Sequence, residues 1–116
     1  MNRTSVMGIS SYDKDTARIL GIPQALLLQS IHEAIVFFPE KHKDIKCDIR
    51  TTGSLASEFP ELSRHTINKA LDDLSSLGVL KIEFIQYVDD DVQNAYWIDH
   101  DKLNVLVPEN EGSDTL

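Results

Sequence analysis

Residues 51–80, TTGSLASEFPELSRHTINKALDDLSSLGVL, decide the fold predicted for this chain. A short helix, with Ser54 as its expected cap, is broken at Pro60, because proline interrupts hydrogen bonding in a helix interior. Ser63 stands where the cap of a longer helix is expected, and Gly78 stands where that helix ends. Two helices joined by a tight turn form a helix-turn-helix. The apolar residues of the longer helix recur at the helical period, and they are Ile67, Ala70, Leu71, Leu74 and Leu77.

The opposite face of the longer helix carries polar side chains that suit contacts with DNA. At about 100° per residue, His65, Asn68 and Lys69 lie opposite the apolar stripe, with Arg64 on its flank. Asparagine pairs with adenine, and arginine or lysine pairs with guanine or phosphate. An ordinary solvated helix face is also polar, so that alternative stays open. The candidate DNA-binding residues are Arg50, Arg64, His65, Thr66, Asn68 and Lys69.

Two β-like runs follow Gly78. Residues 80–87, LKIEFIQY, and 95–98, AYWI, are rich in β-branched and aromatic side chains. Between them, Asp89, Asp90 and Asp91 suit a turn, because carboxylates cap bends and tolerate unusual backbone angles. A third short strand is expected over residues 45–49, where apolar and polar residues alternate. The predicted fold is therefore mainly α-helical with a small antiparallel β-wing, a winged helix-turn-helix.

The first third of the chain predicts two further helices. A short one covers residues 16–20, and a longer one runs from Pro23 to Phe38, with proline favoured in its first turn. The longer helix is so apolar that burial in the core and burial in a homodimer interface are both open. We expect residues 1–12 to be a flexible N-terminus and residues 13–107 to be the winged-helix domain. Residues 108–116 are then an acidic tail or a truncated linker.

The composition excludes several classes of protein. A length of 116 residues is enough for one domain with a single hydrophobic core. No run of about 18 or more apolar residues is present to span a membrane, and the N-terminus lacks the apolar segment of a secretory signal. A cytoplasmic location without a membrane partner is expected. Cys47 is the only cysteine, so an internal disulfide and a multi-cysteine zinc site are excluded.

No catalytic pattern is present in the sequence. The segment HEAIV, residues 32–36, begins like a zinc-protease motif, but Val36 stands where the second histidine is needed. The glycines are not spaced to hold phosphate, and the remaining histidines lie apart from any organising cysteine, serine or carboxylate. We therefore expect no enzyme activity, no metal and no cofactor.

The formal net charge of −8 sets two functions against each other. DNA-binding domains usually carry a basic surface, because phosphate contacts supply much of the affinity. A continuous positive strip along Arg64 and Lys69, with Arg50 or Lys46 nearby, favours DNA. Carboxylates that interrupt this strip favour a basic protein partner, which the acidic wing and tail would contact.

Four stretches of the chain carry a resemblance to a known family. They are ARILGIPQALLLQSIHEAI (17–35), FPELSRHTI (59–67), LDDLSSLGVL (71–80) and YWIDHDKL (96–103). Together they resemble the N-terminal winged-helix domain of phage and plasmid replication initiators, which include plasmid replication protein A of Gram-positive bacteria and DnaD-like phage proteins. The resemblance implies a domain that binds double-stranded DNA in replication, or a small regulator, with a replication or host protein as a further partner. The alternative is an acidic winged-helix module that binds a protein or imitates DNA, and so inhibits a nucleic-acid-binding partner.

Overall fold

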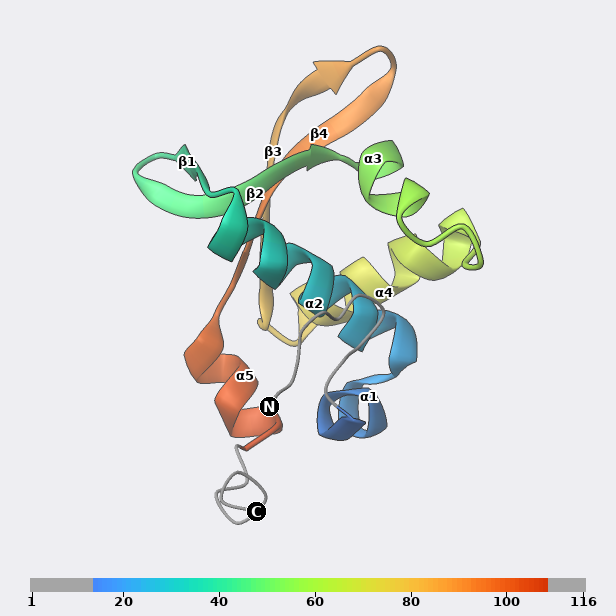
Figure 1. Cartoon of the computed structure of the whole chain (residues 1–116), viewed down its shortest axis with the longest axis vertical. Coiled ribbons are helices and arrows are strands. Elements are labelled where there is room, and N and C mark those ends of the chain that lie inside the picture. The colour runs from blue at the N-terminus through green and yellow to red at the C-terminus, as the bar shows by residue number, and fades with distance from the viewer. Residues whose placement is uncertain (1–13, 109–116) are drawn as a thin grey trace.

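The computed structural model describes residues 14–108 (Figure 1). This part contains five helices and a four-stranded antiparallel sheet, and about half of it is helical. The predicted flexible segment 1–12 and residues 109–116 of the predicted tail lie outside the described residues. The helices are α1 (Lys14–Leu20), α2 (Ile22–Phe37), α3 (Thr52–Ser57), α4 (Arg64–Ser76) and α5 (His100–Leu106). The strands are β1 (Glu40–His42), β2 (Ile45–Thr51), β3 (Leu80–Val88) and β4 (Asp91–Ile98).

Helix α4 begins and ends at the residues that the sequence predicts. The hydroxyl of Ser63 accepts a hydrogen bond from the amide of Thr66 at 3.0 Å, which caps the first turn. At the other end Gly78 takes a left-handed conformation with φ of 79°. The amides of Gly78 and Val79 donate back to carbonyl oxygens of the last turn, at 3.0 and 3.1 Å. This pair of bonds is a Schellman motif, which stops the helix.

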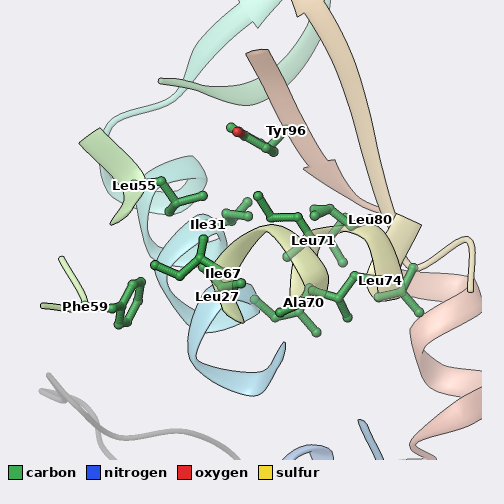
Figure 2. Packing of buried hydrophobic residues seen from close by; sticks show 13 residues of the cluster. Leu27, Ile31, Leu55, Phe59, Ile67, Ala70, Leu71, Leu74, Leu80 and Tyr96 are labelled. Carbon is green, nitrogen blue, oxygen red and sulfur yellow. The ribbon is translucent and has the colours of Figure 1, made fainter. Parts of the chain in front are cut away.

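The core of the described part lies between α2, α4 and the sheet. Figure 2 shows side chains of α4 gathered with Leu27 and Ile31 of α2, while Tyr96 of β4 closes the cluster on the sheet side. The sequence predicted Leu77 in this stripe, and this prediction is wrong. Leu77 is exposed, because the helix ends at Ser76 and Leu77 occupies the cap. The buried residues of α4 are Ile67, Ala70, Leu71 and Leu74.

Helix α3 starts earlier than the sequence predicts. Strand β2 continues to Thr51, and α3 begins at Thr52 directly after it. The hydroxyl of Thr51 accepts a hydrogen bond from the amide of Ser54 at 3.1 Å, so Thr51 is the cap and Ser54 lies within the helix. Strand and helix therefore meet without a loop, which holds α3 tightly to the sheet.

The sheet has the strand order β1-β2-β4-β3, with every neighbouring pair antiparallel. Strand β2 pairs with β4, as predicted for the third strand of the wing. Strand β1 is an addition to the predicted fold, because its three residues, Glu40, Lys41 and His42, are polar and leave no apolar alternation to detect. The sheet is consequently larger than the small wing that the sequence predicts.

Both hairpins of the sheet close through two-residue turns in which neither residue is glycine. In the β3–β4 hairpin, which stands where the sequence predicts the wing and keeps that label below, Asp89 and Asp90 have φ of 51° and 67°. Val88 pairs directly with Asp91. In the β1–β2 hairpin, Lys43 and Asp44 have φ of 53° and 66°. Two successive positive φ angles are the signature of a type I′ turn, whose twist matches that of the flanking strands. The wing is thus a tight hairpin, and the longer polar loop expected before Ala95 is absent from it.

Strand β3 contains one irregularity. The pairing with β4 shifts between Phe84 and Gln86, which leaves Ile85 as an extra residue in a β-bulge. Beyond the bulge, Tyr87 pairs with Val92, and the hairpin extends past the helices (Figure 1). The outer half of the wing is held to the helices at Asp91, the first residue of β4.

Candidate nucleic-acid interface

The first turns of α4 present four of the six predicted DNA-binding residues to solvent. Arg64, His65, Asn68 and Lys69 are all exposed, whereas Thr66 is half-buried and its hydroxyl accepts a hydrogen bond from Ser63 at 2.9 Å. Within the described part of the chain, His65 and Asn68 form no hydrogen bond or ion pair with another side chain. Their polar atoms are therefore available to a ligand.

The β3–β4 hairpin is attached to α3 and α4 through Asp91. This carboxylate accepts hydrogen bonds from the Thr52 hydroxyl at 2.6 Å and from the Gly53 amide at 2.8 Å. Arg64 completes the cluster: its Nη2 donates to Thr52 Oγ1 at 3.1 Å and lies 3.8 Å from Asp91 Oδ1. The hydrogen bond from Thr52, the amide of Gly53 and the charge of Arg64 lower the pKa of Asp91. The first residue of β4 is thus joined to the starts of α3 and α4.

Gly53 leaves room for the Asp91 carboxylate at this junction. A Cβ atom at position 53 would lie 2.5 Å from Asp91 Oδ2, too close for any side chain without a shift. From the sequence, Asp91 was predicted only as part of the acidic turn of the wing. Its role as an anchor depends on partners distant in the chain, and no local pattern indicates them.

Arg50 lies in a different environment from the other candidate residues. Its guanidinium contacts Asp48 Oδ2 at 2.7 Å, Glu58 Oε2 at 2.7 Å and the Ser30 hydroxyl at 3.0 Å. The Arg50 side chain is only 13% exposed, and its charge is paired with carboxylates of the same chain. Burial raises the pKa of Asp48 despite the hydrogen bond and charge of Arg50. This network links α2, β2 and α3, and it leaves Arg50 little freedom to contact phosphate.

The positive charges of α4 each have a carboxylate nearby. Lys69 Nζ lies 3.6 Å from Asp73 Oδ1, while the other oxygen of Asp73 accepts from Gln24 Nε2 at 3.0 Å. Arg64 has Asp91 beside it, and Asp72 is exposed further along the helix. The positive strip along α4 is consequently short and partly offset.

Other chemistry is sparse in the described part. No group of three or more histidine, cysteine or carboxylate side chains within residues 14–108 is placed to hold a metal. His32 and His100 contact each other edge to face, with ring centroids 5.8 Å apart, and burial is the main cause of the lowered pKa of His32. Over the same residues, no helix combines the length and apolar character needed to cross a membrane.

No protein-family model, curated protein or solved structure matches the chain. The arrangement of α3, α4 and the wing is therefore the main observation that bears on function.

Proposed function

We propose that residues 13–107 form a winged-helix domain that binds double-stranded DNA through α4. The order of α2, β2, α3, α4 and the β3–β4 hairpin is the order expected of a winged helix. The observation that carries the proposal is the exposed face of α4, with Arg64, His65, Asn68 and Lys69 beside a wing anchored at Asp91. The biological setting that the resemblance implies is a phage- or plasmid-type replication initiator, or a small regulator, in the cytoplasm.

In this proposal α4 lies in the major groove with its N-terminal turns against the base edges, the usual position of a recognition helix. Asn68 then reads a base, since an asparagine amide pairs with the N6 and N7 atoms of adenine. Arg64 reads guanine or a phosphate, and its bond to Thr52 holds it in place. Lys69 and His65 position the backbone. Half-buried Thr66 and internally paired Arg50 act by supporting this face.

Few cations take part in this contact, so the affinity for DNA is expected to be low. The logarithm of the binding constant falls with the logarithm of salt concentration by about 0.9 for each phosphate neutralised. With Arg64 and Lys69 as the two cations, the expected slope is about −2. Binding by a single domain is then weak, and a homodimer that brings two copies of α4 to the DNA would strengthen it. In the helix predicted from Pro23 to Phe38, the exposed positions at its C-terminal end, Val36, Phe37 and Phe38, are the ones open to such a partner.

A second function is favoured by the distribution of carboxylates. Asp89 and Asp90 are exposed at the wing tip, while Arg50 is paired inside the fold. An acidic winged-helix module of this kind would bind a basic protein, or imitate DNA and inhibit a nucleic-acid-binding partner.

An electrophoretic mobility shift with native flanking DNA at two salt concentrations separates the two functions. The informative variant is Asp89→Asn/Asp90→Asn, because asparagine tolerates the left-handed turn and Asp91 stays in place to anchor the wing. DNA binding that strengthens in this variant supports the first function. Absence of binding at low salt, even in this variant, leaves only the protein-binding function. Asp44→Asn/Asp101→Asn is the matched control, since it changes the net charge equally away from the wing.

A further inference from the structure

Two pairs of aromatic side chains lie exposed on the described surface, outside the face of α4 that is proposed to contact DNA. Phe37 and Phe38 follow one another at the end of α2 and are 69% and 78% exposed. Phe84 and Tyr87 lie on β3, are 51% and 71% exposed, and have ring centroids 5.1 Å apart. Exposed aromatic surface is costly in water, and contiguous patches of it mark sites of association.

Beside Phe37 and Phe38 are two lysines that face each other. Lys41 of β1 and Lys46 of β2 are directly opposite in the hairpin register, and both are exposed. Within residues 14–108 neither forms an ion pair. Like charges directly opposite each other destabilise a strand pair unless an anion lies between them. We call Phe37, Phe38, Lys41 and Lys46 the helix-end patch.

Beside Phe84 and Tyr87 are two unpaired carboxylates. Asp89 and Asp90 form the wing turn, both are exposed, and neither pairs with any described residue. They differ in this from Asp91, which is held by α3. We call Phe84, Tyr87, Asp89 and Asp90 the wing patch.

The two patches are complementary in charge. Each combines two exposed aromatic rings with two unpaired charges, and the charges are of opposite sign. We propose that the wing patch of one copy docks on the helix-end patch of a second copy, with ring against ring and carboxylate against lysine.

The contact joins unlike surfaces. Strand order places the β1–β2 hairpin and β3 at opposite edges of the sheet, and the two hairpins project in different directions (Figure 1). Each copy therefore offers one patch to one neighbour and the other patch to another neighbour. Such heterologous contacts build open chains or closed rings. The exposed face of α4 belongs to neither patch, so the contact between copies does not require that α4 binds DNA.

The size of the patches predicts weak association. A buried aromatic side chain hides about 150–250 Å² of surface, so two partly exposed rings supply a few hundred Å² for each partner. A stable interface buries about 800 Å² on each side. The contact is therefore reversible, and its charged part weakens as salt is added.

Sedimentation velocity over the micromolar to millimolar range, at low and high salt, tests the proposal on the full chain. One variant, Lys41→Glu/Lys46→Glu, makes the helix-end patch acidic. The other, Asp89→Lys/Asp90→Asn, makes the wing patch basic; lysine is acceptable at position 89 because Lys43 adopts nearly the same φ in the other hairpin. Each variant alone should associate about tenfold more weakly than the wild type. An equimolar mixture should associate again, because each altered patch then meets a patch of opposite charge.

The test needs a check that the variants are folded and a control variant with the same change of net charge. Circular dichroism melts establish that each variant is folded, and Asp72→Lys/Asp101→Asn changes the net charge by the same amount as the wing variant at sites outside both patches. This control should associate like the wild type. A wild type that stays monomeric, a control as weak as the wing variant, or a mixture that fails to associate would overturn the proposal. So would loss of association in Phe37→Ser/Phe38→Ser with no effect of the charge variants, which indicates a symmetric contact between α2 ends.

Discussion

Thr52 donates its hydroxyl hydrogen to Asp91 across 2.6 Å, although the two residues stand 39 positions apart in the chain. Thr52 is the first residue of α3 and Asp91 is the first residue of β4. Their hydrogen bond therefore sets how the wing is oriented relative to the helices. Any contact that uses α4 and the wing together depends on it.

We expect Asp91→Asn to lower the melting temperature at pH 7 and to leave it almost unchanged in acid. Because the folded-state pKa of Asp91 is lowered, its stabilising effect is complete above the ordinary aspartate pKa of about 3.9. The effect is lost as the pH falls through the lower folded-state pKa. Circular dichroism melts of wild type and variant should therefore converge as the pH is lowered from neutral through the folded-state pKa of Asp91. Asp90→Asn is the control, and a gap for Asp91→Asn that persists in acid would contradict the anchoring role.

Leu74→Ala should destabilise the protein by roughly 2–5 kcal/mol, because the side chain is fully buried and its removal leaves a cavity. Leu77→Ala, three residues further on, should change the free energy of unfolding by about 0.5 kcal/mol or less, since Leu77 is exposed. Urea denaturation of the two variants gives both values. Equal losses would mean that the inward face of α4 is assigned wrongly.

Glycine at the second position of either hairpin turn should stabilise the fold. Asp90→Gly and Asp44→Gly each remove a side chain from a left-handed conformation, and we expect a gain of about 0.5–1 kcal/mol. Asp72→Gly, within α4, should instead cost about 0.3 kcal/mol, the difference between the helix propensities of aspartate and glycine. Thermal melts of the three variants compare the same substitution in two backbone conformations. Destabilisation by both turn variants would refute the turn assignment.

Arg50→Ala should destabilise the protein by roughly 3–5 kcal/mol, because it leaves the buried carboxylate of Asp48 without its partner. The double variant Asp48→Asn/Arg50→Met should lose less, since no uncompensated charge then remains. Arg18→Ala serves as the control, because Arg18 pairs with Asp15 on the exposed surface. Chemical denaturation of the three variants tests the network, and a double variant as unstable as Arg50→Ala would contradict it.

Two substitutions on α4 should affect DNA binding in different ways. Lys69→Ala should weaken binding about equally on all sequences and reduce the salt slope by about one unit. Asn68→Ala should relax the preference at one base pair, at a cost of roughly 1–3 kcal/mol. Fluorescence anisotropy titrations with matched and mismatched duplexes separate the two effects. Lys81→Ala on β3 removes the same charge away from α4 and should leave binding unchanged.

Helices α1 to α4 could be predicted because their signals are local, whereas α5 (His100–Leu106) was not predicted. Ser63 caps α4 and Gly78 ends it. Both residues adjoin the helix in the sequence, so the sequence alone indicates where the helix begins and ends. Strand β1 escaped prediction because its three polar residues acquire a strand conformation only by pairing with β2. The two-residue turn of the wing was not predicted, because Asp89-Asp90 lacks the glycine that usually indicates such a turn.

The candidate site could be predicted only in part, for the same reason. The exposed positions of α4 follow from helical periodicity. The partners of Arg50 and Asp91 do not, because they come from α2, α3 and β2, which only tertiary packing brings together. Arg50 was predicted to be a cation available to DNA, but in the fold it forms ion pairs with Asp48 and Glu58.

The bulge at Ile85 has a consequence for solubility. Strand β3 forms an open edge of the sheet, and a long regular edge invites strands from other molecules to add to it, which leads to amyloid-like aggregation. The bulge interrupts the row of free backbone groups and increases the local twist, and Lys81 adds a charge near the start of the strand. Sheet growth is thereby discouraged along the same strand whose aromatic side chains stay exposed, so molecules can meet there through side chains without fusing their backbones.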